Sequence, residues 1–414
     1  MESNLISCNL DGKTIDNVQP NIKVQFWERS FSLNSLKKMK CYLDKKKIIP
    51  QLIKNSLTYT PIKKLKKGSH KLKLKIKYKN GKKKEYCFRF NVNTLQQEYS
   101  YFYGIPHSHT SYSSGKGTPS KAYKYAAKNE LDFLIISDHY SGLKKTINES
   151  SSTTRWNKLK NESKNFKNKR SKFLPLYGYE TKGYLGSHIN ILFSEKLIPN
   201  LKNLKKLKEV ASSNPNMIIS LNHPAKKILK MDYDSQLDKV INLIEVANGS
   251  PPNKYKDYYD LYFKMLDKGW HLGALNSQDN HLENWGDSDN LTAIIADKLS
   301  YKSFAEALKK RRVYSTESKS LKLKFLANNK WMGSLVPLSS QGDIDLYVKA
   351  EDKTYLIKNL EIISNKGEVI FNKSFNAHIA EFQEKISSKA GQYYVAKVTL
   401  SDNKSALSSA IYVI

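Results

Sequence analysis

Hydrophobic and polar positions follow two different rhythms along this chain. Between about residues 18 and 93, apolar residues tend to recur at every second position, most strictly in Lys71–Lys79, where lysine and apolar residues alternate. A period of two is typical of a β-strand with one buried and one solvated face. Asn80-Gly81 separates this run from Tyr86–Val92, which predicts a hairpin. Residues 1–98 are therefore expected to form a small antiparallel β-sandwich.

The rhythm changes over residues 99–318, where continuous apolar runs alternate with helical segments. Leu131–Ser137 is such a run and suits a buried parallel strand. Thr118 followed by Pro119 suits the start of a helix. Strands of the same kind are expected at Phe173–Leu176, Met217–Leu221, Asn242–Val246, Leu272–Leu275 and Leu291–Ala296, and helices near 201–212, 253–268 and 302–312. Repeated βα units predict a barrel or a doubly wound sheet, and the polar stretch 141–172 is a candidate lid or surface helix.

The period of two returns over residues 319–414. Strands are expected at Leu321–Phe325, Asp343–Ala350, Leu360–Ile363, Glu368–Phe371, Tyr393–Leu400 and Ser408–Val413. This pattern predicts a second β-sandwich. The fold class is therefore α/β, with a central domain at 99–318 between two small all-β domains at 1–98 and 319–414.

Charge adds a second feature to the first domain. The net charge of the chain is +32, and residues 1–98 hold 23 lysines and arginines against 7 acidic residues, which is half of the excess. Lysine on a solvated strand face protects a sheet from aggregation, which explains part of this charge. The alternative is binding to nucleic acid or to another anionic surface.

Several classes of protein are disfavoured. No apolar run approaches the roughly 18 residues of a membrane span, so no membrane span is expected. The first residues lack a basic segment followed by an apolar one, so we expect no signal peptide and a cytoplasmic location, or an extracellular one for a trimmed precursor. The three cysteines show no Cys-x-x-Cys spacing, which argues against disulfides and thiolate metal sites.

Histidine is concentrated in the central domain, in short motifs beside the apolar runs. Six of the nine histidines lie there, together with two acidic residues: His107, His109, His139, His188, His223 and His281, with Glu180 and Asp279. The C-terminal ends of parallel strands converge at one edge of a fold, where functional side chains gather. His188 is the exception, because it begins an apolar run. Imidazole with carboxylate suits Zn²⁺, Mn²⁺ or Fe²⁺, and Glu180 is the natural bridge between two ions.

These motifs carry a resemblance to a known family. His107-Ser-His109, Ser137-Asp-His139, Tyr179-Glu180, Gly186-Ser-His188, Asn222-His-Pro224 and Asp279-Asn-His281 resemble the successive motifs of the PHP (polymerase and histidinol phosphatase) superfamily. Arg312-Val-Tyr-Ser-Thr316 and Trp331-Met-Gly-Ser334 resemble its CehA/McbA-type metallohydrolases. The resemblance implies a distorted (β/α)7 PHP-type barrel with two or three divalent transition metal ions.

The resemblance also implies a ligand set. One metal would take His107, His109, Glu180 and Asp279; a second would take Glu180, His188 and His223; a third would take His139, His281 and a residue after His109. This chain has Ser114 and Gly115 where family members place Asp or His, so a dinuclear centre is an alternative. His139 or Asp138 would then take part in proton transfer. Candidate substrate-binding residues are Lys116, Arg155 and Asn222.

The function implied is metal-dependent hydrolysis of phosphomonoesters or nucleotide 5′ termini, with a metal-activated hydroxide as the nucleophile. Three alternatives remain open. The first is a 5′–3′ exonuclease on DNA or RNA that uses the basic first domain as a backbone track. The second is a hydrolase of carboxyl or carbamate esters, and the third is a degenerate, non-catalytic protein that binds polyanions.

Overall fold

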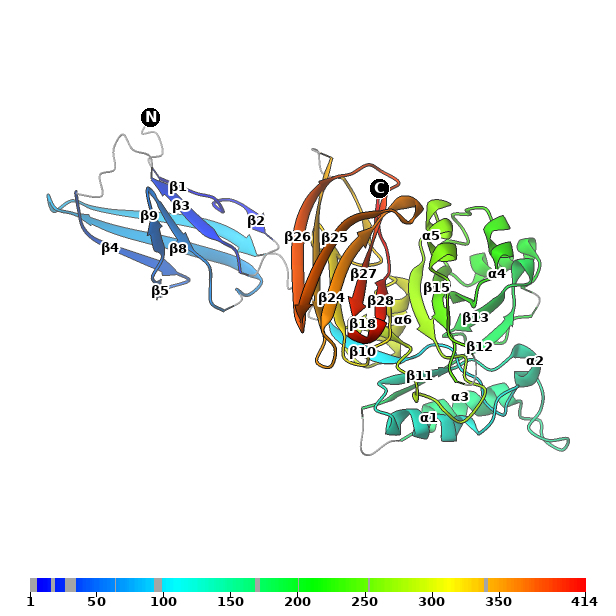
Figure 1. The fold of residues 1–414 in the computed structure, drawn as a ribbon. Helices are drawn as coiled ribbons and strands as arrows, with labels where there is room; N and C mark the ends of the chain where they lie inside the picture. Colours follow the sequence, from blue (N-terminus) through cyan, green and yellow to red (C-terminus); the bar gives the residue numbers. More distant parts are fainter. Residues whose placement is uncertain are drawn as a thin grey trace. The chain divides into compact units, whose positions relative to one another are not determined.

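The computed structural model describes residues 6–15, 19–26, 35–63, 65–92, 99–167, 172–199, 201–251, 254–338 and 342–414. The chain divides into two compact units, Met1–Glu98 and Tyr99–Ile414 (Figure 1). Residues 93–98, which fall at the predicted first boundary, lie outside the described part. Among the described residues, no helix combines the length and the apolar character that crossing a membrane requires.

The first unit consists of two small sheets. One has the order β1 (Ile6–Cys8), β3 (Ile22–Phe26), β7 (Ser56–Tyr59) and β6 (Gln51–Ile53); the other has the order β2 (Thr14–Ile15), β9 (Lys83–Val92), β8 (Gly68–Tyr78), β4 (Leu36–Leu43) and β5 (Lys46–Ile48). The turn between β8 and β9 lies at Asn80-Gly81, as expected, and Gly81 has a φ of 83°. The alternation places Leu72, Leu74 and Ile76 in the core. The lysines between them therefore point outward.

The second unit begins with a curled sheet covered by helices (Figure 1). Its strands are β10 (Ser100–Ile105), β11 (Phe133–Ile136), β12 (Leu174–Lys182), β13 (His188–Leu192), β14 (Ile218–Asn222), β15 (Ile241–Asn248), β16 (Lys256–Asp257), β17 (Gly273–Ser277), β18 (Leu291–Ala296) and β19 (Val313–Thr316). Its helices are α1 (Pro119–Lys128), α2 (Tyr140–Leu143), α3 (Arg155–Asn165), α4 (Leu204–Ser213), α5 (Tyr259–Asp267) and α6 (Tyr301–Lys309). Helix α1 packs on β11, α3 on β12, α5 on β15 and α6 on β18. The polar stretch 141–172 thus contains a helix that covers the sheet.

The predicted (β/α)7 barrel is not confirmed, because the strands depart from a strict repeat of that kind. Strand β13 runs antiparallel to both β12 and β14. Only Gly183–Ser187 join β12 to β13, whereas a parallel connection needs about a dozen residues or more. At the seam between β17 and β18 the Thr292 hydroxyl accepts a hydrogen bond from Asn276 N at 2.9 Å and donates one to Asn276 O at 2.8 Å. A side chain therefore joins these two strands where the described residues show no ladder pairing.

The curled sheet continues into the C-terminal strands. Strand β19 pairs with β28 (Ser405–Ser408), followed by β27 (Tyr393–Leu400), β24 (Ile357–Ile363) and β25 (Val369–Ala377); β29 (Ile411–Val413) pairs with β27 and β22 (Leu335–Val336). A second sheet has the order β21 (Lys330–Trp331), β20 (Lys322–Ala327), β23 (Asp343–Glu351) and β26 (Ile379–Ser387). Some core residues of β24, β27, β28 and β29 pack in the same cluster as those of the α/β part, whereas the core residues of the second sheet belong to another cluster. The boundary at residue 318 stays a prediction.

A buried tyrosine ties the last strand to the α/β part, and its removal tests that link. The Tyr412 hydroxyl accepts from Leu272 N at 2.7 Å and donates to Leu272 O at 2.9 Å. Tyr412→Phe leaves a buried N–H without this acceptor, so the free energy of unfolding should fall by about 1–3 kcal/mol in urea titrations. Tyr347→Phe removes an exposed hydroxyl from Glu381 and should cost less than about 0.5 kcal/mol. Equal losses would contradict the proposed tie.

Candidate metal centre

The eight predicted metal ligands come together at one edge of the curled sheet. His107 and His109 follow β10, and His139 follows β11. Isolated β-bridges join Ser108 to Asn280 and His139 to Glu180, so the segments beyond the strand ends lie side by side. The remaining members are on or beside β12, β13, β14 and β17: Glu180, His188, His223, Asp279 and His281. The convergence expected for the ends of neighbouring strands is thus present.

The reversed strand β13 explains why His188 begins an apolar run. Because β13 is antiparallel to β12 and β14, its first residue lies at the edge where its neighbours end. The register places His188 opposite Lys182 on one side and Asn222 on the other. A histidine at the start of this strand therefore joins side chains at the ends of the adjacent ones.

The carboxylate of Glu180 lies at the centre of the cluster and is only 2% exposed. Five imidazoles contact it. Oε1 lies 3.3 Å from His188 Nδ1, 3.3 Å from His223 Nε2 and 3.6 Å from His107 Nε2, while Oε2 lies 2.9 Å from His139 Nδ1 and 3.6 Å from His109 Nε2. The two oxygens thus face different sets of imidazoles, which is the arrangement that a bridging carboxylate requires.

A second carboxylate, Asp279, meets the first two histidines. Its Oδ1 lies 3.3 Å from His107 Nε2 and 3.1 Å from His109 Nε2, and these two nitrogens are 3.1 Å apart. Asp279 has a φ of 48° and His223 a φ of 29°, a backbone region that costs energy for residues other than glycine. The fold therefore holds two candidate ligands in strained conformations.

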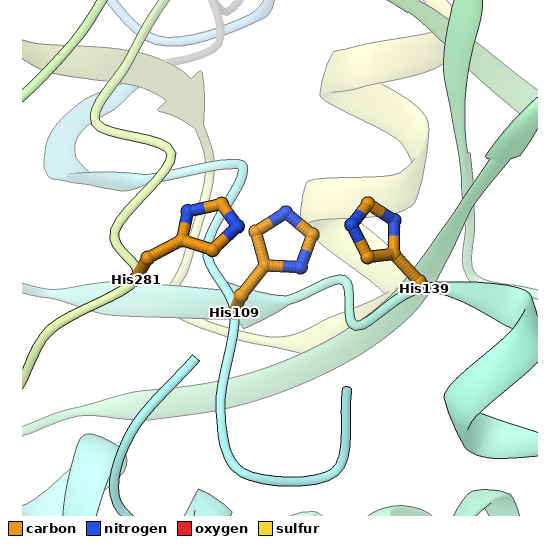
Figure 2. A group of neighbouring side chains, drawn as sticks. All are labelled: His109, His139 and His281. Atoms are coloured by element: carbon orange, nitrogen blue, oxygen red, sulfur yellow. The ribbon is translucent and has the colours of Figure 1, made fainter. Parts of the chain in front are cut away.

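Three groups of side chains in the described residues have the spacing of a metal site. They are His107, His109 and Glu180; Glu180, His188 and His223; and His109, His139 and His281. In the third group His109 lies between the other two imidazoles, with ring centroids 4.5 Å from His139 and 4.4 Å from His281 (Figure 2). Glu180 and His109 each belong to two groups, so the three groups form one continuous cluster.

The electrostatics of the cluster favour a cation. Burial disfavours a proton on His107, but Asp279, Glu245 and Glu180 outweigh burial and raise its pKa to about 10. Burial, together with the charge of His107, lowers the pKa of His109 to about 4. Burial also opposes charge on Glu180 and Asp279, yet the imidazoles hold the pKa of both carboxyl groups well below the ordinary range. The buried carboxylates thus stabilise positive charge at the position where the imidazole nitrogens converge.

Glu245 belongs to this site, although the sequence patterns did not single it out. It is buried within β15, where its Oε1 lies 2.8 Å from His107 Nδ1 and its Oε2 accepts from His223 N and Asn248 Nδ2, each at 2.6 Å. A carboxylate on the far nitrogen of a ligating imidazole fixes its tautomer and orientation. The available signal was a lone acidic residue in the apolar run Asn242–Val246.

Asp138 and Asn222 lie at the site but in supporting positions. The Asp138 carboxylate is fully buried and accepts hydrogen bonds from Thr110 N at 2.8 Å and from the hydroxyls of Thr110 and Ser113. Burial raises its pKa to about 6, opposed by these hydrogen bonds. Asn222 donates through Nδ2 to Glu180 Oε1 at 3.1 Å. Each side chain is engaged within the protein, and the roles of Asp138 in proton transfer and of Asn222 in substrate binding stay predictions.

The two predicted cationic contacts to substrate, Lys116 and Arg155, do not line the cavity beside the cluster, and their role stays a prediction. Arg155 Nη1 donates a hydrogen bond to the Tyr112 carbonyl at 3.2 Å. The side chain of Lys116 is exposed, and its backbone N–H donates to the His281 carbonyl at 3.0 Å. An open cavity of about 580 Å³ adjoins the cluster, and neither residue lines it. Its lining is His139, Tyr140, Ser141, Glu180, Thr181, Lys182, His188 and Lys202. Lys182 and Lys202 are therefore the cationic side chains of this cavity.

Comparisons with known proteins give distant likenesses. No family model and no curated protein matches the sequence. A two-domain protein from Bacteroides vulgatus that contains a predicted PHP-like metal-dependent phosphoesterase is similar at 18% identity, over 74% of this chain and 92% of that chain, with a TM-score of 0.44. PsfC from Pseudomonas syringae is similar at 16% identity, over 50% of this chain and 87% of that chain, with a TM-score of 0.34. Both scores are below 0.5, and the function must be inferred from the side chains of the site.

The role of Glu245 gives a test that depends on the site alone. Three donors converge on its two oxygens, so Glu245→Gln would direct an amide N–H at one of them. We expect this change to weaken Mn²⁺ or Zn²⁺ binding about 10- to 100-fold in calorimetric titrations. Asp238→Asn is the matched control, because Asp238 holds His271 Nδ1 at 2.7 Å outside the site. Unchanged metal affinity in Glu245→Gln would refute the positioning role.

Proposed function

We propose that this chain is a metal-dependent phosphoesterase of the PHP superfamily that acts on small phosphomonoesters. The arrangement of Glu180 carries the proposal, since one buried carboxylate directs its two oxygens at different sets of imidazoles. A site of this kind beside an open cavity with two lysines suits an anionic substrate. Assignment to the CehA/McbA-type subgroup is part of the same proposal and rests on the resemblance of two motifs.

The residues present fit a pair of divalent cations. Nitrogens of His107 and His109 approach each other to 3.1 Å around an Asp279 oxygen that has no hydrogen-bond donor of its own. We assign His107, His109, Glu180 and Asp279 to one ion, and Glu180, His188 and His223 to the other. A pair of ions about 3.5–4 Å apart lowers the pKa of bound water and neutralises phosphoryl oxygens.

Other side chains orient these ligands and attract the substrate. Glu245 fixes His107, Asn222 fixes Glu180, and Asp138 fixes the loop that follows His109. Lys182 and Lys202 supply positive charge to the cavity wall, which favours a phosphate ester over a neutral carboxyl ester. His139 belongs to the third donor group with His109 and His281, and it would serve in proton transfer only where that group holds no ion.

Metal dependence and substrate class are tested together. We expect the purified chain to bind about two transition metal ions, to lose p-nitrophenyl phosphate hydrolysis after chelation and to regain it with Mn²⁺ or Zn²⁺. Glu180→Gln should abolish this activity. Hydrolysis of p-nitrophenyl acetate without phosphatase activity would instead favour a carboxyl esterase, and stepwise loss of 5′-labelled oligonucleotides would favour an exonuclease. Fewer than about one ion per chain would refute the dinuclear assignment.

The lysines of the cavity give a second, independent test of the substrate class. Lys182→Gln and Lys202→Gln should each raise KM for a phosphomonoester about two- to fivefold, because an exposed ionic contact contributes about 1 kcal/mol or less. The value of kcat should change little, and the effect should shrink as salt rises. Lys205→Gln, on the exposed side of α4, is the control and should leave KM unchanged. Equal KM values in all three variants would exclude these lysines from substrate binding.

A further inference from the structure

The first unit exposes aliphatic side chains at one edge of its two sheets. Strands β5 and β6 are the edge strands of the five-stranded and four-stranded sheets, and Ile49-Pro50 connects them. Ile49 is 86% exposed, Leu52 47% and Ile53 55%. We call these three residues the apolar edge. Neighbouring exposed aliphatic side chains are typical of a surface that binds another protein or a membrane.

Lysines flank the apolar edge on both sides in the sequence. The segment reads Lys45-Lys-Lys-Ile-Ile-Pro-Gln-Leu-Ile-Lys54, and its four lysines are all exposed. Apolar side chains between lysines are typical of segments that lie in a membrane interface, where the chains reach the acyl boundary and the charges meet the headgroups.

A broader cationic surface lies on the adjoining sheet. The outward side of β4, β8 and β9 carries the lysine face, which consists of Lys38, Lys40, Lys73, Lys75, Lys77 and Lys83. The only acidic residue in these three strands is Glu85, which contacts Lys73 at 2.6 Å and Lys75 at 3.4 Å. Strand β5 pairs with β4, and Ile49-Pro50 leads from β5 directly to β6, so the apolar edge adjoins the sheet that carries the lysine face.

The register of these strands places like charges opposite one another. Lys40 faces Lys75, and Lys77 lies between Lys38 and Lys83. Like charges directly opposite each other destabilise a sheet. A strand face can be solvated without placing lysine opposite lysine, so solvation alone does not explain these pairs. An anionic surface on the lysine face would relieve the repulsion.

We propose that the first unit docks on an anionic lipid bilayer, with the apolar edge at the boundary of headgroups and acyl chains and the lysine face against the headgroups. Charge complementarity supplies the attraction, since the headgroups of an anionic leaflet attract lysines that lie near its surface. Nucleic-acid phosphates would complement the lysines equally well, but they offer no apolar environment for three exposed aliphatic side chains. This docking does not depend on the proposed phosphoesterase activity.

Vesicle sedimentation with the full chain tests the proposal. We expect binding to phosphatidylcholine vesicles that contain phosphatidylglycerol, and about tenfold or more weaker binding to phosphatidylcholine alone. The triple change Ile49→Ser, Leu52→Ser and Ile53→Ser should weaken binding to anionic vesicles roughly tenfold or more. The control replaces three exposed aliphatic residues in the second unit, Val369→Ser, Ile370→Ser and Ile379→Ser, and should bind like the unchanged chain.

Charge variants and a competing polyanion separate lipid from nucleic acid. Lys38→Gln, Lys40→Gln and Lys75→Gln together should weaken vesicle binding about tenfold or more, whereas Lys358→Gln, Lys373→Gln and Lys389→Gln in the second unit should not. All variants should keep the unfolding midpoint of the unchanged chain. Two outcomes would overturn the lipid assignment: unchanged vesicle binding in the apolar-edge variant, or tighter binding to a DNA duplex than to vesicles at the same salt.

Discussion

The contact between the Glu180 carboxylate and its ring of imidazoles is the interaction on which the rest of the candidate centre depends. A carboxylate that is almost completely buried is costly unless charged or hydrogen-bonded partners surround it. Here the partners come from β13 and from the segments that follow β10, β11 and β14, so one side chain connects elements far apart in the sequence. Strand β12 is long enough to place Glu180 beyond the end of β11, where these elements converge.

Further carboxylates outside this ring hold its members in place. Glu245 binds the far nitrogen of His107 and the backbone of His223, and Asp138 binds the loop that follows His109. Asp238 makes the same kind of contact with His271 outside the centre, so a carboxylate–imidazole pair that is largely shielded from solvent is not by itself a sign of a metal site. The candidate centre differs because two of its imidazoles, those of His107 and His109, also meet a second carboxylate, that of Asp279.

The sequence predicted which histidines and carboxylates gather at one place better than it predicted their surroundings, for physical reasons. Histidine is scarce and polar, so its clustering beside apolar runs indicated a common site, and the structure brings these histidines together. Glu245 gave a weaker signal, because one acidic residue in an apolar strand has several explanations. Lys116 and Arg155 could not be distinguished from Lys182 and Lys202, since in a chain with 70 lysines and arginines only the three-dimensional position selects among them. The reversed direction of β13 was not predicted, because it depends on the length of the one short connection between β12 and β13. Strand β26 was not predicted either, because most of its side chains are exposed.

The loop after His109 bears on how many ions the centre holds. Lys116 N donates to the His281 carbonyl, and Gly115 lies so close to the His109 backbone that an added Cβ would meet it at 2.8 Å. Position 115 therefore has no room for a ligand side chain, and Ser114 is exposed beside it. The third donor group must then rely on His109, whose Nε2 already lies 3.1 Å from Asp279. Because one imidazole nitrogen serves one ion, a third ion would have to share His109 with the first and would have only His139 and His281 as ligands of its own, which favours the proposed dinuclear centre.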